Sequence, residues 1–393
     1  MLRSLYSAIA GLRSHQTMLD VTGNNIANVN TAAFKASSVQ FQDTLSQLTQ
    51  AAGGPQPETG GTNPAQVGLG VQLAGISTNF TQGSAQVTGR STDMMISGDG
   101  FFVTRQGNEV LYTRAGSFDF DSQGRLVTPS GALVQGWNAV GGSISTGGAV
   151  GTIVLPQDAI SPAAVTDAVT VAGNLPADAA VGDELVRDTT VYDASGEGRT
   201  LTLTFTRTAT GWTVDADDPD AATPATGTGT LAFVDGELDS GGTLTIGGIT
   251  VDLGGTTGYA GVTTVGVTDQ DGRSAGTLNG FTLGKDGTLV GSFSNGETAA
   301  IGRIALATFV NPGGLEKAGS SSYRSTFNSG TPELGTPGSG SLGTLTGGSL
   351  EMSNVDLSQE FTNLIVAQRG FQANARVITT SDEVLQELTN LKR

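Results

Sequence analysis

The sequence predicts a mainly β fold, with two β domains, the outer inserted into the inner, and an α-helix at each end of the chain. Three observations support this prediction. The 393 residues include 59 glycines and many Thr and Ser. Gly reaches positive φ without steric cost and Thr fits a half-exposed pleated face, so this mixture suits short strands joined by tight turns. Apolar and polar residues alternate in the middle of the chain, whereas apolar residues recur every three or four positions at both ends, which is the helical period.

The N-terminal helix is predicted by a run of apolar or neutral residues whose steps alternate between four and three. This run contains Leu5, Ile9, Leu12, Gln16 and Leu19. The heptad spacing places these residues on one face of a helix of roughly 20 residues. We expect this seam to pack against other helices.

The C-terminal helix is predicted by a longer seam of the same kind. Asp356 is the expected N-cap, and Gln359 stands three residues further on, as in a capping box. A helix of roughly 35 residues would be about 50 Å long at 1.5 Å per residue. The seam contains Leu357, Phe361, Leu364, Gln368, Phe371, Ala375, Ile378, Asp382 and Leu385.

Glycine- and proline-rich stretches at 50–61 and 335–343 stand between the two helices and the middle of the chain, and we expect linkers or long loops there. Further breaks fall near Pro156 and Asn279. The expected division is a terminal helical assembly domain (1–30 and 354–393), a connector (31–70), an inner β domain (71–145 and 280–353) and an outer inserted β domain (146–279).

Strands in the middle of the chain are marked by alternation, as at 201–206, where Leu and Phe alternate with Thr. Hairpin turns are expected at 121–124, 285–287 and 294–296, each with Asp or Asn shortly before Gly. The segment from Asp119 also begins like a calcium loop, but Ser130 stands where that loop requires a bidentate Glu. We therefore expect a turn there.

The net charge of −17 repels phosphate backbones, so we expect no nucleic acid partner. No window approaches the roughly 18 to 20 apolar residues of a membrane-spanning helix, so we expect no membrane insertion. The N-terminus also lacks the pattern of a secretory signal peptide.

The residues offer little for catalysis. There is no cysteine and one histidine, His15, which lies off the seam and is expected on the surface. The usual zinc sites and Ser-His-Asp triads cannot be built from this set. Paired carboxylates could serve a secreted glycosidase, but an aromatic content of 6% leaves little to line a sugar-binding cleft. We expect no enzyme, and no catalytic, cofactor-binding or metal-binding residues.

Asparagines crowd the end of the N-terminal helix at Asn24, Asn25, Asn28 and Asn30. One explanation is a helix C-cap, because Asn tolerates the left-handed conformation. The other is a subunit contact, because a single cap needs only one such residue. The sequence leaves both open.

The terminal helices could complete the core of the β body or pack against other copies of the chain, and the flexible stretches beside them favour the second. Isolated helices of this length are marginal in water. We therefore expect both ends to be largely disordered before assembly and to order when several copies bury the seams together.

The motifs at the two ends resemble those of the bacterial flagellar rod and hook proteins. Gly-Asn-Asn-Ile-Ala-Asn at 23–28 and Ala-Phe-Lys at 33–35 are similar to the N-terminal signature. Ser-Asn-Val-Asp-Leu at 353–357 and the stretch 365–374 are similar to the C-terminal one. The large inserted segment around 190–196 resembles hook subunits more than distal rod subunits, which remain the alternative.

This resemblance implies a structural subunit that polymerises with itself into a helical, curved and hollow tube. The tube is a universal joint that passes torque from rod to filament. Its implied partners are the hook cap protein, the distal rod protein, the hook–filament junction proteins and the flagellar type III export apparatus. The implied location is extracellular, at the flagellar hook, after export without a cleaved signal peptide.

Overall fold

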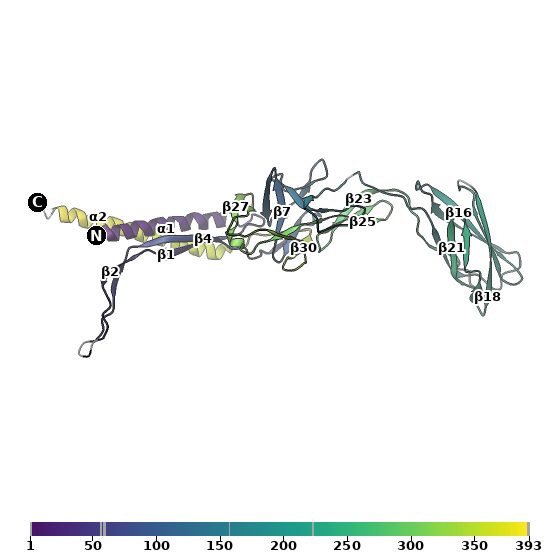
Figure 1. Ribbon diagram of the computed structural model, residues 1–393, viewed down its shortest axis with the longest axis horizontal. Coiled ribbons are helices and arrows are strands. Elements are labelled where there is room, and N and C mark those ends of the chain that lie inside the picture. The colour runs from purple at the N-terminus through teal and green to yellow at the C-terminus, as the bar shows by residue number, and fades with distance from the viewer. Residues whose placement is uncertain (1, 56, 58–59, 157, 222–223, 391–393) are drawn as a thin grey trace. The chain divides into compact units, whose positions relative to one another are not determined.

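The computed structural model describes residues 2–55, 57, 60–156, 158–221 and 224–390. They fold into two compact units, shown in Figure 1. Unit 1 consists of Met1–Leu155, Thr282–Val290 and Ala300–Arg393, and unit 2 of Pro156–Phe281 and Gly291–Ala299. The outer domain expected at 146–279 overlaps unit 2, which also takes in the hairpin tip at 291–299.

Both terminal helices are formed in the single chain. Helix α1 (Leu2–Ala27) lies beside helix α2 (Leu357–Asn390) in unit 1 (Figure 1). This differs from the expectation that the ends order only on assembly. The reason lies in small residues, which allow the two helix axes to approach closely. A Cβ on Gly11 would lie 2.8 Å from the Asn374 side chain, and a Cβ on Gly370 would lie 2.5 Å from the His15 ring.

The buried stripe of α1 is different from the predicted seam. It consists of small or polar residues at helical spacing, namely Ala8, Gly11, Ser14, Thr22 and Asn25. The predicted seam occupies the adjacent face, where Leu5, Ile9, Leu12 and Leu19 are half-buried. The heptad pattern therefore identified the helix but placed its intramolecular contact about a third of a turn away.

The start of α2 is capped as expected by Asp356, whose Oδ1 accepts hydrogen bonds from the backbone N–H groups of Ser358 at 2.8 Å and Gln359 at 3.3 Å. The capping box is wrong, because the Gln359 amide donates to Asn363 instead. The surface position expected for His15 is also wrong. Its ring is half-buried and meets the Phe41 ring edge-on at 5.9 Å.

The stretch expected to be a connector, 31–70, contains strands. Strand β1 (Ser37–Asp43) pairs with β4 (Val71–Thr78), and both lie along α1 (Figure 1). Beyond them β2 (Ser46–Gln50) pairs with β3 (Ala65–Gly68) in an exposed two-stranded arm. The second expected linker, 335–343, folds into turns that close on the body, with the Gly343 N–H donating to the Asp99 carbonyl at 2.7 Å.

The rest of unit 1 is a β body. The central order is β25-β11-β7-β8-β28-β27, and two short pairs, β5 with β31 and β6 with β30, lead toward the helices. Its aromatic core includes Phe101, Tyr112, Trp137 and Tyr323. The strands are β5 (Ala85–Val87), β6 (Met94–Ser97), β7 (Phe101–Gln106), β8 (Glu109–Thr113), β9 (Asp119–Phe120), β10 (Leu126–Val127), β11 (Leu133–Asn138), β12 (Gly151–Thr152), β26 (Leu306–Thr308), β27 (Glu316–Gly319), β28 (Ser322–Arg324), β29 (Glu333–Gly335), β30 (Thr344–Gly347) and β31 (Ser349–Glu351).

Unit 2 is a curled sheet around one core, in the order β15-β16-β17-β18-β19-β21-β14-β22, with its first and last strands near each other. The predicted alternation is confirmed, because Leu201, Leu203 and Phe205 are fully buried. The strands are β13 (Ile160–Ser161), β14 (Ala168–Asn174), β15 (Glu184–Tyr192), β16 (Gly198–Arg207), β17 (Trp212–Asp218), β18 (Ala225–Val234), β19 (Glu237–Ser240), β20 (Thr243–Ile246), β21 (Ile249–Thr257) and β22 (Gly266–Gln270). Strands β23 (Gly276–Leu283), β24 (Thr288–Phe293) and β25 (Thr298–Ile304) run across the boundaries of the two units.

The three turns that the sequence predicts are confirmed. Gly124, Gly287 and Gly296 have φ values of 71°, 77° and 81°. The Asp121 carboxylate accepts from the N–H of Gln123 and ion-pairs with Arg125 at 2.7 Å. Its oxygens therefore serve the turn, as the turn interpretation of this segment requires.

Unit 2 should fold alone, because its core cluster runs from Val169 to Val267 and the isolated bridge Ala164↔Arg273 closes its ends. We predict that a fragment of residues 164–275 is a β-rich monomer that unfolds cooperatively. Its single tryptophan, Trp212, is buried, so its fluorescence should shift to longer wavelength on unfolding in urea. A fragment that lacks a cooperative transition would contradict this division of the chain.

Candidate assembly surface and its anchor

The two ends of the chain are fixed to the β body by a buried ion pair. Lys35 Nζ lies 2.6 Å from Glu351 Oε1, and both side chains are inaccessible to solvent. Lys35 also donates to the Thr81 carbonyl at 2.8 Å, and Glu351 Oε1 accepts from the Gly83 N–H at 2.8 Å. Burial lowers the pKa of Lys35, and the hydrogen bond and charge of Glu351 oppose that shift. The pair thus joins the segment after α1 to strand β31, which leads into α2.

A second cation, the Arg114 guanidinium, lies close to the Glu351 carboxylate. Arg114 Nη1 lies 3.7 Å from Glu351 Oε2 and donates to the Gly98 carbonyl at 2.9 Å. Its guanidinium also lies over the Phe101 ring at 5.4 Å. Nearby, burial raises the pKa of Tyr323 to about 12, so this phenol stays neutral. The charged groups of Lys35, Arg114 and Glu351 therefore lie close to one another within the chain.

Asn354 completes this anchor. Its Oδ1 accepts from the Ala36 N–H at 2.8 Å, and its Nδ2 donates to the carbonyls of Asn79 and Thr81 at 2.9 and 3.1 Å. Ala33, with a φ of 57° and no exposed surface, turns the chain so that its N–H reaches the Glu351 carbonyl at 2.8 Å. The segment after α1 and the segment before α2 are thus joined by backbone and side-chain bonds.

The asparagine cluster divides into two roles. Asn25 is buried and connects three elements: its amide donates to the Ser37 carbonyl at 2.8 Å and to Glu360 Oε1 at 3.0 Å, and accepts from the Ser37 N–H at 3.0 Å. Asn28 donates to Asn24 at the helix end, in an exposed arrangement. The Asn25 side chain is therefore used inside the chain, whereas Asn24 and Asn28 lie at the surface of the helix end.

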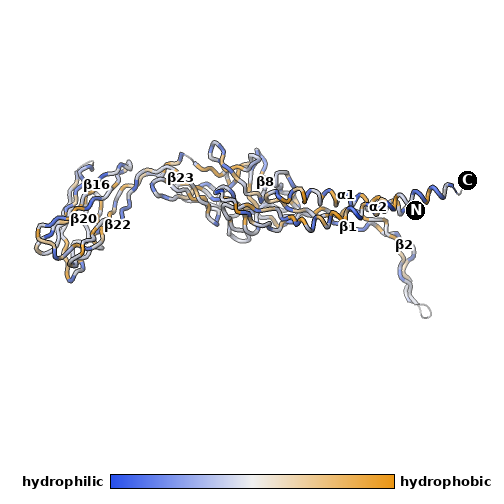
Figure 2. The backbone as a smooth tube through the Cα atoms, turned by 180° about the vertical axis from the view of Figure 1, so that it is seen from behind, coloured by the Kyte–Doolittle hydropathy of each residue, from blue (hydrophilic) through white to orange (hydrophobic). Residues whose placement is uncertain are grey.

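Helix α2 keeps apolar side chains in water on two sides. One exposed stripe, at spacing i, i+4, i+8, is Leu357, Phe361 and Ile365, and a second is Val366, Val377 and Val384. Because an α-helix advances about 100° per residue, Thr362 lies on a polar ridge between the two stripes. Figure 2 shows hydrophobic segments along both helices. Exposed apolar stripes of this kind mark surfaces that bind a partner.

The same part of unit 1 exposes further apolar side chains. They include Tyr6 on α1, Leu73 and Ile76 on β4, and Leu48 and Val67 on the β2–β3 arm. The β2–β3 arm is a two-stranded hairpin with little support from the rest of unit 1, and such a hairpin is only marginally stable in water unless it packs against something. We define the assembly surface as the two α2 stripes, Tyr6 and these exposed hairpin residues.

The residues predicted for subunit packing fall into three groups, of which the first is the asparagines Asn24, Asn25 and Asn28 at the end of α1, described above. Leu357 and Phe361 lie on the assembly surface. Leu5, Ile9, Leu12, Leu19, Leu364, Phe371, Ile378 and Leu385 are half-buried in the helix-pair region. The sequence interpretation missed Ile365 and Val366, whose i+4 and i+5 positions after Phe361 were a usable signal. It assigned no role to Lys35, Glu351 or Asn354, because pairing of residues 316 positions apart has no local signature.

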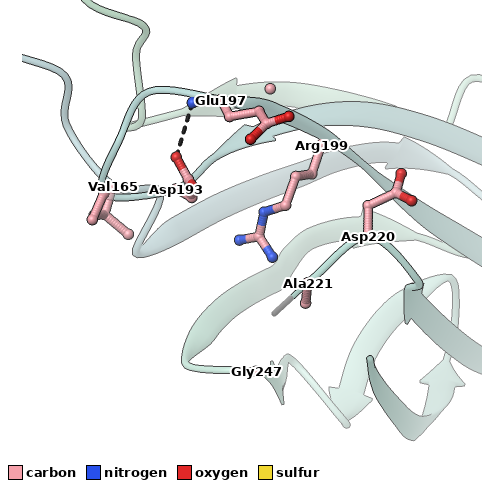
Figure 3. A pocket seen from close by; sticks show the side chains of 9 residues that line it. Val165, Asp193, Glu197, Arg199, Asp220, Ala221 and Gly247 are labelled. Atoms are coloured by element: carbon pink, nitrogen blue, oxygen red, sulfur yellow. Dashed lines mark hydrogen bonds between the residues drawn. The ribbon is translucent and has the colours of Figure 1, made fainter. Parts of the chain in front are cut away.

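A hollow of about 710 Å³ in unit 2 is lined mainly by turns, including Asp193, Glu197, Arg199 and Asp220 (Figure 3). Arg199 pairs with Asp218 at 2.9 Å, and Asp193 accepts from the Glu197 N–H at 2.8 Å. Hydrogen bonds from the Ser195 hydroxyl and from the Glu197 N–H lower the pKa of Asp193. Arg199 and Asp193 thus take part in internal pairing and in turn structure.

Among the described residues, no group of three or more His, Asp and Glu side chains gathers as a metal site. Neither helix, over its described length, combines the length and apolarity needed to cross a membrane.

The negative charge is concentrated in unit 2. That unit holds 19 of the 36 acidic residues but only four of the 19 basic ones, so it carries −15 of the net −17. Arg199 and Arg273 are ion-paired within the unit, at 2.9 and 3.1 Å, and Arg187 and Arg207 donate to its backbone carbonyls. The remaining acids therefore leave a strongly anionic surface.

Three family models match separate parts of the chain. "Flagella basal body rod protein" matches residues 5–35, "Flagellar hook protein FlgE/F/G D1 domain" matches 95–173, and "Flagellar basal body rod FlgEFG protein C-terminal" matches 346–391. The first and last cover the segments that the Lys35–Glu351 pair joins.

Similar proteins align over the whole chain. The flagellar hook protein FlgE of Borreliella burgdorferi is 40% identical and that of Treponema pallidum 39% identical, each with 100% of both chains covered. The flagellar basal-body rod protein FlgG of Bacillus subtilis is 34% identical with the same coverage. The crystal structure of Helicobacter pylori flagellar hook protein FlgE2 matches at 15% identity and a TM-score of 0.48, covering 68% of this chain and 100% of that one.

The anchor makes a direct prediction about stability. Lys35→Met leaves the Glu351 carboxylate buried without its nearest cation, which should lower the stability of unit 1 by about 3–5 kcal/mol. The double variant Lys35→Met/Glu351→Gln should recover at least half of this loss, because Gln still accepts from Gly83. Calorimetry can measure both, with the transition of unit 2 as the internal control. A single-variant loss below about 1 kcal/mol would show that the pair is not the anchor.

Proposed function

The chain belongs to the flagellar hook protein FlgE family, and on that premise we propose that its assembly surface builds the hook polymer. The chain is a structural subunit of the bacterial flagellar hook. Copies stack into a curved hollow tube that transmits torque from the rod to the filament as a universal joint. The observation that carries the proposed assembly role is the pair of exposed apolar stripes on α2, Leu357–Phe361–Ile365 and Val366–Val377–Val384.

The geometry of the helix pair explains how such a polymer could grow. Small residues allow α1 and α2 to approach closely inside one copy, and the apolar side chains of the two α2 stripes remain exposed to other copies. A helical polymer needs heterologous contacts that repeat without closing. Two stripes on different sides of one helix supply two such contacts.

The charge of unit 2 suits a joint that must bend. Strongly anionic copies repel one another at short range, and this repulsion is screened over about 10 Å at 0.1 M salt. Contacts between copies of unit 2 are therefore expected to be weak, wet and able to slide, whereas unit 1 carries the adhesive apolar surface. Unit 1 would therefore hold the copies together while the contacts between copies of unit 2 allow the polymer to bend.

The partners follow from family membership as part of the proposal. The subunit passes through the flagellar type III export apparatus without a cleaved signal peptide. It then assembles beneath the hook cap protein, on the distal rod protein and below the hook–filament junction proteins. The mature location is extracellular, at the flagellar hook. The role is structural, with cohesion between copies in place of catalysis.

A distal rod subunit is the second candidate, favoured by the full-length similarity to a protein named FlgG. That relative aligns across the inserted segment too, so the insertion alone does not separate the two candidates. The hook relatives have the higher identities, at 40% and 39%. Electron microscopy of the assembled protein discriminates them, because a curved tube supports the hook and a straight one the rod.

Phe361→Asp tests the assembly surface. Phe361 is about half exposed in the single chain, so the variant should lose little stability, about 0.5 kcal/mol or less. A charge buried between copies should nevertheless abolish polymerisation, because an unpaired buried charge is costly. Sedimentation and calorimetry on the purified chain would measure the two effects separately.

Thr362→Asp is the matched control. It places the same charge one residue away, on the polar ridge of the same helix turn, and should polymerise like the wild type. Equal polymerisation of both variants would remove the first stripe from the interface, and equal loss would mean that the effect is not specific to the stripe.

The charge of unit 2 gives a separate prediction. Polymers of the wild type should change curvature when NaCl falls from about 150 to 10 mM, since screening then reaches about 30 Å instead of 8 Å. A variant with four exposed acids replaced, Asp215→Asn, Asp217→Asn, Asp239→Asn and Asp269→Asn, should change less. Electron microscopy at the two salt concentrations measures this, and equal responses would count against electrostatic control of shape.

A further inference from the structure

Two loops of unit 1 lie against each other, at 310–314 and 326–330, and we name them the Phe327 loop pair. Asn311 connects them, because its N–H donates to the Ser329 carbonyl at 3.3 Å and its amide donates to the Asn328 carbonyl at 3.0 Å. Thr326 adds a hydroxyl bond to the Gly314 carbonyl at 2.6 Å. The two loops therefore behave as one piece of surface.

The turn that carries Phe327 is fixed from beneath. Ser329 is fully buried, and its hydroxyl donates to the Thr326 carbonyl at 2.8 Å and accepts from the Thr326 N–H at 2.9 Å. A Cβ on Gly314 would lie only 2.7 Å from the Asn328 carbonyl carbon. Such close packing leaves the turn one conformation, so little entropy is lost when it binds.

This rigid turn holds an aromatic side chain entirely in water. Phe327 is fully exposed, and Val310 is 93% exposed. Val310 lies close to the same turn, since a Cβ on Gly330 would be 3.8 Å from the Val310 Cβ. Neither side chain supports the core of unit 1, and the hydrogen bonds of the turn use backbone and hydroxyl groups that do not require an aromatic. Aromatic side chains on rigid turns are typical binding hot spots.

The absence of charged side chains from the two loops indicates which partner they bind. Residues 309–315 and 325–332 contain no charged side chain, in a chain with a net charge of −17. A cationic partner would be recognised by carboxylates, and the two loops contain none; of the flanking acids, Glu316 pairs with Arg324 at 3.7 Å. A second copy carries the same negative charge, so copies can approach at neutral, apolar surfaces without repulsion. We propose that the Phe327 loop pair is a contact through which one copy of this chain binds a second copy in the polymer.

This contact rests on the proposed function and lies outside the assembly surface of the helices and hairpins. It would join the β bodies of neighbouring copies, in addition to the contacts of α2. In a helical polymer the Phe327 loop pair of one copy would contact a different surface of the next copy, which is a heterologous contact that can repeat.

Phe327→Ser in the full chain tests the proposal. Loss of one buried Phe should raise the critical concentration for polymerisation about 10- to 100-fold, and the unfolding transition of the monomer should not change. Val140→Ser is the matched control, because Val140 is an 84% exposed valine elsewhere in unit 1, and it should polymerise normally. A critical concentration of Phe327→Ser within twofold of the wild type would overturn the proposal.

A second measurement keeps the aromatic ring in place. A photo-crosslinking phenylalanine at position 327 should join copies in the polymer and give no dimer in dilute monomer. Absence of a copy-to-copy crosslink in intact polymer overturns the contact even if the α2 stripes are confirmed. Failure of the wild-type chain to polymerise would remove the proposed function together with this contact.

Discussion

A lysine and a glutamate that are both withdrawn from water join the two ends of this chain. Lys35 and Glu351 stand 316 residues apart in sequence and 2.6 Å apart in space. Breaking a buried pair by removing one partner leaves an uncompensated charge, so the pair strongly penalises any arrangement in which the two ends separate. Because α1 leads into one side of this anchor and α2 leaves the other, the helices emerge together. Every apolar surface that they present depends on that arrangement.

Small and large residues have different roles on the two helices. Gly11 and Gly370 allow the two helices to approach closely inside one copy. Phe361, Ile365 and Val366 are left at the surface, where a soluble monomer would be expected to carry polar residues. A chain that also buried these three side chains in its own helix pair would have less apolar area available for polymerisation.

The sequence predicted the helices and strands whose apolar residues recur at a regular spacing. It missed the contacts between residues that are far apart in the chain. Heptad spacing identified both helices, and alternation at Leu201, Leu203 and Phe205 identified a buried strand face, because these patterns are periodic. The buried stripe of α1 escaped, since Ala8, Gly11 and Ser14 do not stand out as apolar. The predicted disorder of the ends took account of the low helix propensity of glycine but not of the close helix packing that glycine allows. Lys35, Glu351 and Asn354 acquire their roles only from contacts made across the whole chain.

Charge is distributed unevenly between the two units. Unit 1 is nearly neutral and carries the exposed apolar stripes, the hairpin arm and the Phe327 loop pair, whereas unit 2 carries −15 of the net −17 with its four arginines engaged internally. Apolar contacts fix copies in register at short range, and like charges oppose adhesion over about 8–10 Å at ordinary salt. A polymer whose cohesive contacts and repulsive surfaces lie in separate units can deform in one without breaking the other. That separation is what a bending shaft requires, because each turn must lengthen one side and shorten the other while its subunits stay attached.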